Sequence, residues 1–357
     1  MRVNMYPEEN ISNGSQEPSK LRRRYLALLG LAPSAFMTKL SFAQEAPAKK
    51  SPANSLIEGK EYWVNRKMDA QNIRLFLWRK RIVGNTSKGV ILFIHGSSMA
   101  GTPTFDLQIP GKPEYSAMDT FANLGYDTWS LDHEGYGRSD KNRQINFNIA
   151  NGIGDLEAVI PEILRLTGQS SIMLYGISSG SLRAAGYAQQ YPTKVSKIAL
   201  DAFVWTGEGS PTLSERRKRL AQWESNNRRP VDKAMISSVF TRDHAGTADP
   251  VVVDAFANAI LALDSSMPTG TYYDMSVNLP VVDPEKMVMP TLIMRGQYDG
   301  IAGFQDLLNF FAKIPSPDKQ FSVMPGIAHA SFQERNVAIA YHVLDGFFSQ
   351  PKPVYRG

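Results

Sequence analysis

A serine between two glycines is the residue of this chain best placed to act as a nucleophile. The pattern Gly176-x-Ser178-x-Gly180 follows the apolar run Ser171–Tyr175, which predicts a buried strand, and precedes a helical pattern rich in small residues. A serine hydroxyl attacks well only when it is held exposed and beside a base. A sharp strand-to-helix turn exposes it, and the turn needs glycine two residues to either side. We therefore expect Ser178 to be a nucleophile, with a structural Gly/Ser turn as the alternative.

A serine nucleophile needs a histidine base, and only three of the five histidines follow Ser178. In serine triads built on such a turn, the order along the chain is serine, acid, histidine. His329 lies in a loop just past the predicted strand Phe321–Met324. His244 lies in a polar stretch that we expect to be solvated, and His342 lies within the last predicted helix. His329 is therefore the predicted base.

Two aspartates qualify as the acid that orients the histidine. Asp299 follows the predicted strand Thr291–Arg295, and Asp201 lies in the predicted strand Ile198–Phe203. Both lie at carboxyl ends of strands, where residues that face a ligand gather. We favour Asp299 and keep Asp201 as the alternative, while either could also be a turn aspartate that bonds its own backbone.

The oxyanion formed by serine attack requires fixed N–H donors. The backbone N–H of Ser179 is one candidate, since the free N–H groups of a helix N-terminus point outward. The second candidate is the N–H of Ser97, in the His95-Gly96-Ser97-Ser98 loop after a predicted strand. We expect His95 to stabilise this loop rather than to act as a second base.

The elements that must position these residues alternate between strands and helices. This order favours a mainly parallel sheet with helices on both faces, preceded by an antiparallel edge pair over Tyr62–Met68 and Ile73–Trp78. Residues 204–289 interrupt the alternation with a helix-rich segment, which we expect to form a cap over one sheet edge. The predicted central strands are Val90–His95, Thr128–Asp132, Ser171–Tyr175, Ile198–Phe203, Thr291–Arg295 and Phe321–Met324, and the predicted helices are Tyr115–Leu124, Ile153–Leu166, Ser179–Gln190 and Asn336–Phe348.

Composition and charge exclude several classes of protein. Hydrophobic residues make up 43% of the chain and charged residues 20%, which excludes disordered and collagen-like chains. Because there is no cysteine, a disulfide framework, a thiolate metal site and a thiol nucleophile are excluded. The first 43 residues hold six Lys or Arg against three Glu, so +3 of the formal charge of +5 belongs there. The remaining charge of +2 gives little support to nucleic-acid binding.

The N-terminus has the layout of an export signal. Arg22, Arg23 and Arg24 precede an apolar run, Ala27–Met37, that is shorter than the ~20 residues needed to span a bilayer. Ser41-Phe42-Ala43 offers small residues to a signal peptidase, and the arginine pair resembles a twin-arginine signal. We expect a signal peptide over 1–43, a linker over 44–56 and a periplasmic or secreted mature protein without a stable membrane anchor. A disordered basic tail on a cytosolic enzyme is the alternative.

Five motifs in order make residues 57–350 resemble the α/β-hydrolase family, leaving residues 351–357 as a tail. This resemblance implies an eight-stranded, mostly parallel sheet with helices on both faces, no metal and no cofactor. It also implies a helical cap, here residues 204–289, inserted between strands six and seven. One departure is Glu134, where many relatives carry Arg or Pro. The motifs are the His95-Gly96 loop, Leu131–Ser139, Gly176–Gly180, Gly296-x-x-Asp299 and His329.

The serine at the turn narrows the expected reaction. Family members that open epoxides or remove halides use an aspartate there, whereas serine favours acyl transfer to water through an acyl-enzyme. We therefore expect an exported serine hydrolase that cleaves a small or medium apolar carboxylic ester. Cleavage of an amide, a lactone or a carbon–carbon bond by the same triad is an alternative, as is a non-catalytic binding protein.

The cap segment supplies basic and aromatic residues whose role the sequence leaves open. We expect Arg216–Arg219 and Arg228–Arg229 to form a solvated face, with attraction of an anionic ester as the alternative. An aromatic residue is more often core than pocket wall. The candidates for a pocket wall are Met99, Phe203, Trp205, Trp223, Phe240, Tyr272, Tyr273 and Phe332.

Overall fold

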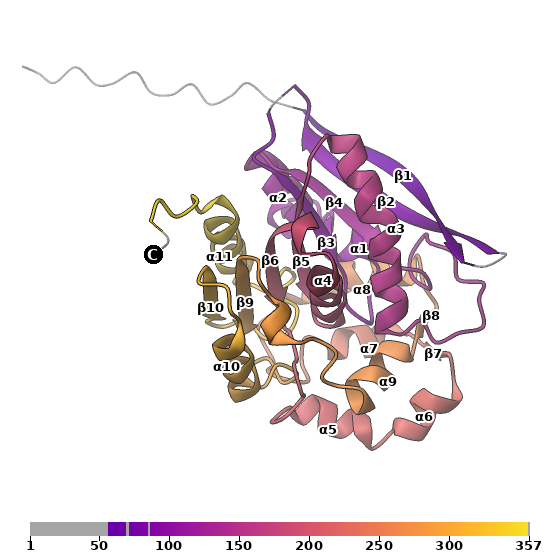
Figure 1. Cartoon of the computed structure of the whole chain (residues 1–357). Coiled ribbons are helices and arrows are strands. Elements are labelled where there is room, and N and C mark those ends of the chain that lie inside the picture. Colours follow the sequence, from indigo (N-terminus) through magenta and orange to yellow (C-terminus); the bar gives the residue numbers. More distant parts are fainter. Residues whose placement is uncertain (1–55, 69–70, 85, 356–357) are drawn as a thin grey trace, which may run out of the picture. The chain divides into compact units, whose positions relative to one another are not determined.

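The computed structural model describes residues 56–68, 71–84 and 86–355 (Figure 1). The predicted signal peptide lies outside these ranges, as does the predicted linker except for its last residue. Regular structure runs from Ile57 to Ser349. None of the helices in the described ranges has a stretch long and apolar enough to cross a bilayer.

Eight strands form one sheet, in the order β1-β2-β4-β3-β5-β6-β9-β10. β1 pairs antiparallel with β2, and β2 pairs antiparallel with β4, whereas the six strands from β4 to β10 are parallel to one another. The predicted eight-stranded, mostly parallel sheet is thereby confirmed. The strands are β1 (Ile57–Met68), β2 (Gln71–Ile82), β3 (Val90–Ile94), β4 (Asp127–Asp132), β5 (Ile172–Ile177), β6 (Val195–Asp201), β9 (Thr291–Gly296) and β10 (Lys319–Met324).

Helices cover both faces of this sheet, and each face has its own apolar cluster (Figure 1). Side chains alternate along β3: Leu92 packs with α3 and α4 on one face, and Phe93 packs with α2 and α11 on the other. Because β3 is covered on both faces, it is apolar throughout rather than alternating with polar residues. The helices outside the cap segment are α1 (Gly101–Phe105), α2 (Ala117–Asn123), α3 (Ile149–Thr167), α4 (Ser179–Gln190), α10 (Phe304–Lys313) and α11 (Val337–Ser349).

The segment between β6 and β9 contains five α-helices, one short 3-10 helix (Pro284–Lys286) and a small second sheet. Asp232 and Asp249 cap the N-termini of α7 and α8, and Ser210 caps α5, so local capping defines three of these helices. The antiparallel pair β7–β8 was not expected, because three-residue strands have no alternation to recognise. The elements are α5 (Pro211–Arg217), α6 (Leu220–Ser225), β7 (Arg228–Pro230), α7 (Lys233–Ser238), α8 (Pro250–Leu261), β8 (Ser266–Pro268) and α9 (Gly270–Val277).

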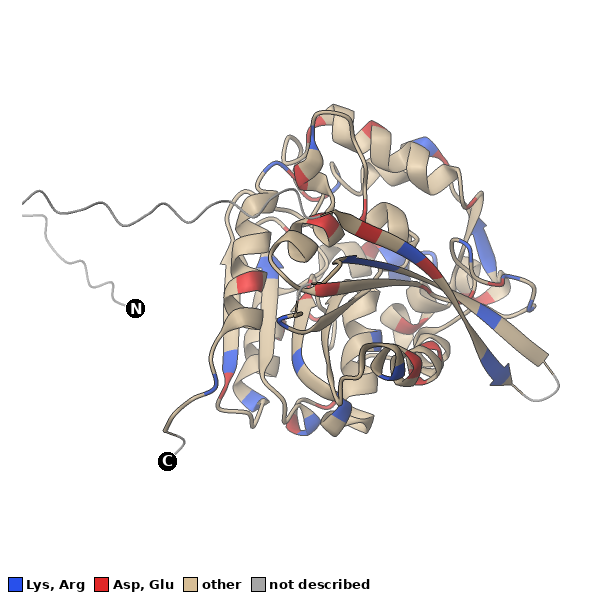
Figure 2. Ribbon diagram, turned by 90° about the horizontal axis from the view of Figure 1, so that it is seen from above, with Lys and Arg blue, Asp and Glu red and all other residues tan. Residues whose placement is uncertain are grey.

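Charged residues of both signs are interspersed along the elements seen in Figure 2. On the long β1–β2 hairpin, Glu58 pairs with Arg81, and Glu61 lies 3.9 Å from Arg138. Such exposed pairs contribute little stability, about 0–1 kcal/mol each.

Candidate active site

Ser178 lies at the turn between β5 and α4, in a backbone conformation that residues other than glycine rarely adopt. Its φ is 58° and its ψ is −125°. The backbone N–H of Ser178 donates to the Asp201 carbonyl (2.9 Å), and the Ser181 hydroxyl donates to the carbonyls of Gly176 and Asp201. These bonds hold the strained turn in place, as expected where strain serves a functional site. Within the described residues the Ser178 hydroxyl has no hydrogen-bond partner, so it is not committed to a structural role.

The two glycines of the turn allow helix α4 to approach the sheet closely. A Cβ on Gly176 would come within 2.6 Å of the Gly180 carbonyl oxygen. A Cβ on Gly180 would overlap with the Ile94 carbonyl oxygen at the end of β3. Glycine is thus required by packing at both positions of the pattern, in agreement with the expected strand-to-helix turn.

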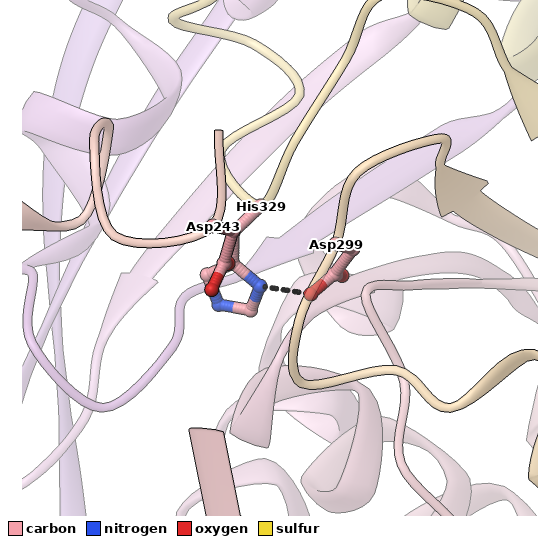
Figure 3. A group of neighbouring side chains, drawn as sticks. All are labelled: Asp243, Asp299 and His329. Atoms are coloured by element: carbon pink, nitrogen blue, oxygen red, sulfur yellow. Dashed lines mark hydrogen bonds and ion pairs between the residues drawn. The ribbon is translucent and has the colours of Figure 1, made fainter. Parts of the chain in front are cut away.

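His329 and Asp299 meet above the carboxyl ends of β9 and β10. The His329 Nδ1 donates to Asp299 Oδ1 at 3.1 Å, and both side chains are buried (Figure 3). Glu334 fixes the histidine loop, because its carboxylate accepts from the backbone N–H groups of Ala328 and Ala330. With the Nδ1 proton directed at a carboxylate, the Nε2 of His329 is left as the basic nitrogen.

The Asp299 carboxylate is charged at neutral pH. Burial raises its pKa, but the neighbouring His329 and the Ile301 N–H, which donates to Oδ1 at 2.9 Å, outweigh burial and hold the pKa below its ordinary value. A charged acceptor beside Nδ1 stabilises the imidazolium that forms when Nε2 takes a proton. The pair therefore has the geometry and charge of a base with its orienting acid.

Asp201 occupies a different environment at the end of β6. Its Oδ2 accepts the Tyr175 hydroxyl at 2.6 Å, and in the described part of the chain it forms no hydrogen bond with His329. Burial raises the pKa of Asp201 to about 7, so the carboxyl is partly protonated at neutral pH. A partly neutral acid stabilises an imidazolium less than a full carboxylate.

The two predicted oxyanion residues lie side by side. The Ser97 hydroxyl donates to the Ser179 hydroxyl at 2.7 Å, which joins the loop after β3 to the start of α4. Neither backbone N–H of this pair has an acceptor among the residues that the structure describes. Gly96 packs against Ser178, since a Cβ there would lie 3.3 Å from the Ser178 Cβ. His95 is fully buried and accepts from the His133 N–H, which is a structural role in the loop.

The other two histidines that follow Ser178 are exposed. His342 faces outward from α11. His244 stacks on the Tyr298 ring, with 3.8 Å between ring centroids. Neither resembles the buried, carboxylate-bonded environment of His329.

Asp243 is a site residue that the sequence analysis missed. This aspartate comes from the loop between α7 and α8, yet its side chain is 4% exposed and lies beside the Asp299–His329 pair (Figure 3). Its Oδ1 accepts the Thr212 hydroxyl at 3.2 Å, and Arg242 Nε lies 3.4 Å away. In sequence it is one of many polar residues in the cap, and no motif marks it.

Asp243, Asp299 and His329 also form a group that could offer ligands to a metal ion. One ligand atom from each lies within 4.8 Å of the others, and no second such group occurs in the described ranges. However, the Nδ1 proton already bonds Asp299, and the positive charge of Arg242 lies against Asp243. Both carboxylates thus have partners within the protein, and we interpret the group as an Asp–His pair flanked by a second carboxylate.

A cavity of about 670 Å³ lies between the cap segment and the loop that carries Asp299. Arginines dominate its charged lining, and Arg216 and Arg229 are buried, so the expected solvated face is wrong for these two. Burial becomes possible because their guanidinium groups pack on the Tyr272 ring. Of the predicted pocket residues, Trp223 and Tyr272 line this cavity, whereas Phe203, Phe240 and Phe332 are core residues of the apolar clusters.

Solved structures share this fold at low sequence identity. A thermophilic esterase from Thermogutta terrifontis, solved with malate bound, has a TM-score of 0.58 at 18% identity, over 80% of this chain and 97% of that one. An esterase from Exiguobacterium antarcticum has a TM-score of 0.59 at 16% identity, over 81% and 99%. A monoacylglycerol lipase from Paleococcus ferrophilus has a TM-score of 0.57 at 15% identity, over 77% and 98%. These structures show that the chain has the α/β-hydrolase fold.

The sequence itself identifies the family. No curated protein sequence matches the chain. The family described as serine aminopeptidase, S33, matches residues 114–336, a range that contains the Ser178 turn, Asp299 and His329. Because this range covers more than half of the chain, the protein is a hydrolase that belongs to the serine aminopeptidase, S33, family.

Proposed function

We propose that the protein is a serine hydrolase that cleaves a carboxylic ester, with Ser178 as nucleophile, His329 as base and Asp299 as acid. The observation that carries this proposal is the 3.1 Å hydrogen bond from His329 Nδ1 to Asp299 Oδ1. It forms at the carboxyl ends of the parallel strands, where the strained Ser178 turn also lies. A charged carboxylate that orients a buried histidine has little use in a binding protein.

The proposed reaction runs through an acyl-enzyme. The His329 Nε2 takes the Ser178 hydroxyl proton while Oγ attacks the ester carbonyl carbon, and the N–H groups of Ser97 and Ser179 stabilise the oxyanion. When this intermediate collapses, the carbon–oxygen bond to the alcohol breaks and His329 returns the proton to the leaving alcohol. Water then attacks the acyl-enzyme with the same base, which releases the acid and restores Ser178.

The cap favours an ester over the peptide that the family description suggests. An aminopeptidase substrate presents a free ammonium group near the scissile bond. Here the cavity beside the site is lined by four arginines against two carboxylates, Glu215 and Asp243, and this excess of positive charge disfavours an ammonium ion. The esterases among similar structures support the same choice.

Covalent labelling tests this proposal directly. We expect a fluorophosphonate probe to label the native protein at Ser178, since an activated serine attacks phosphorus and loses fluoride. Peptide mapping by mass spectrometry locates the label, and 4-nitrophenyl esters run beside 4-nitroanilides separate ester from amide cleavage. Heat-denatured protein is the control. A folded protein that takes no label, or a label elsewhere, contradicts the assignment.

We also propose that the protein is exported, on the evidence of its N-terminal sequence alone. The mature chain is expected to begin near Gln44. Replacing Arg22 and Arg23 together by lysine is expected to leave the full-length precursor in the cytoplasm, because the twin-arginine pathway reads this pair. Cell fractionation and N-terminal sequencing measure both outcomes, with Lys20→Arg as a control. An exported protein that still begins at Met1 contradicts the proposal.

A further inference from the structure

The cap cavity holds buried guanidinium groups that have no carboxylate partner. Arg216 and Arg229 are 5% and 6% exposed, and among the described residues neither forms a salt bridge. The Nη1 of Arg216 and the Nε of Arg229 are buried without any hydrogen-bond acceptor. Leaving a charged donor unpaired in the interior is costly, and a ligand that supplies the acceptor would remove this cost.

Tyr272 is the residue on which this positive charge converges. The guanidinium carbon of Arg216 lies 3.9 Å from its ring centroid, and that of Arg229 lies 4.3 Å away. Burial alone raises the pKa of the phenol, but the two arginines outweigh burial and lower it to about 6. Burial lowers the pKa of Arg216 to about 10, which leaves its guanidinium charged at neutral pH.

The charge of the lining suits an anion. Four arginines line the cavity, with Glu215 and Asp243 as its carboxylates. Glu215 pairs with Lys218 and Asp243 pairs with Arg242, so neither carboxylate pairs with Arg216 or Arg229. A carboxylate of a ligand can do so, because the planar fork of an arginine matches its two oxygens.

Direct contacts connect the cavity to the catalytic loop. The Nη2 of Arg229 donates to the Ser98 hydroxyl at 2.7 Å, and the Tyr272 and Ser98 hydroxyls lie 3.0 Å apart. Ser98 is the neighbour of Ser97, one of the two proposed oxyanion donors. On the other side, the cavity reaches Asp243 beside His329. Ser178, His329 and Asp299 do not line the cavity themselves, so the cavity is joined to the proposed catalytic residues through Ser98 and Asp243.

We propose that the arginines of the cap cavity bind a carboxylate of the substrate, so that the enzyme acts on esters that carry a free acid group. The statement that acidic esters are hydrolysed rests on the proposed function. The statement that a carboxylate binds rests on the buried guanidinium groups alone. It replaces the expected apolar ester by an acidic one.

A matched pair of substrates tests the inference. 4-Nitrophenyl hemiadipate and 4-nitrophenyl hexanoate have acyl chains of equal length, and a carboxylate replaces the terminal methyl group in the first. We expect kcat/KM to be at least tenfold higher for the hemiadipate, a difference of about 1.4 kcal/mol. Equal values for the two esters overturn the inference.

Two arginine variants test whether the cavity causes the preference for the acidic ester. Arg216→Gln and Arg229→Gln, made separately, are each expected to lower the hemiadipate-to-hexanoate ratio of kcat/KM tenfold or more. Lys233→Gln is the matched control, because it removes one positive charge from an exposed position of the same cap, where Lys233 pairs with Asp254. A ratio that falls equally in the control, or in neither arginine variant, contradicts the assignment.

Binding of adipate itself separates this inference from the proposed function. Calorimetric titration of the native protein with adipate is expected to show millimolar or tighter binding, and Arg216→Gln is expected to weaken it at least tenfold. Turnover of both esters at equal rates leaves ester hydrolysis standing and removes the anion site. If neither ester is turned over, the proposed function fails and the titration decides: binding that depends on Arg216 supports the site, and no binding overturns it.

Discussion

Ser178→Ala is expected to lower kcat for ester hydrolysis by a factor of about 10⁴ or more while leaving the fold intact. The alanine side chain lacks the nucleophilic oxygen, so no acyl-enzyme forms at this position. Folding is preserved because the Ser178 hydroxyl makes no hydrogen bond in the described structure. The bonds that shape the turn remain, since they come from the Ser178 backbone N–H and from the Ser181 hydroxyl. The measurement is steady-state turnover of a 4-nitrophenyl ester, with circular dichroism as the check on folding.

Ser170→Ala provides a control at the other end of the same strand. Ser170 is exposed just before β5, far along the strand from the turn, and its loss should change kcat less than twofold. Host esterases must be excluded by purifying the variant on unused resin. A folded Ser178→Ala protein that retains a tenth or more of the native kcat shows that another residue is the nucleophile.

The second large effect is expected from Asp299→Asn, which should lower kcat by about 10³–10⁴. The asparagine keeps the size of the side chain, but the carboxylate charge that stabilises the imidazolium is lost. Its amide group can also present an N–H donor where His329 Nδ1 needs an acceptor. The histidine then presents the wrong tautomer to Ser178. Turnover should be measured at saturating substrate, so that changes in substrate affinity do not enter.

Asp201→Asn decides between the two acids. Asp201 bonds Tyr175 rather than His329, and burial raises its pKa to about 7, so its loss is expected to lower kcat roughly tenfold or less. Both variants need a thermal unfolding curve, because both side chains are buried. If Asp201→Asn is the crippled enzyme and Asp299→Asn is nearly normal, the acid follows β6 and our assignment is wrong.

Much of the fold was predictable because its causes are local. β3 is apolar on both faces, so its five consecutive apolar residues predict a buried strand. Helix α4 was predicted with its observed bounds, Ser179–Gln190, because a strand-to-helix turn begins it and Pro192 prevents its continuation. The glycines of the turn were predictable because the turn itself crowds them. Gly176, for example, packs against the backbone of Gly180 and Ser181, which belong to the same turn.

The three-residue strands β7 and β8 show where local reasoning stops. Neither is long enough to carry a periodic pattern, and each exists because the other pairs with it across about 40 residues of chain. Their pairing places Arg229 beside Ser98 and Tyr272, which are distant in sequence. No property of the basic run by itself distinguishes Arg229 from an exposed arginine.

By itself the sequence determined the class of fold, the Ser178 turn and the histidine loop, because hydrophobic periodicity and glycine placement act over a few residues. It favoured Asp299 but could not exclude Asp201, since both lie at strand ends, and it favoured a solvated face for the cap arginines. The tertiary structure alone decided which aspartate meets His329, that Asp243 lies beside this pair, and that Arg216 and Arg229 are buried on Tyr272. The physical reason is that burial and hydrogen bonding depend on partners from distant segments, whose positions are set only when the sheet and the cap pack together.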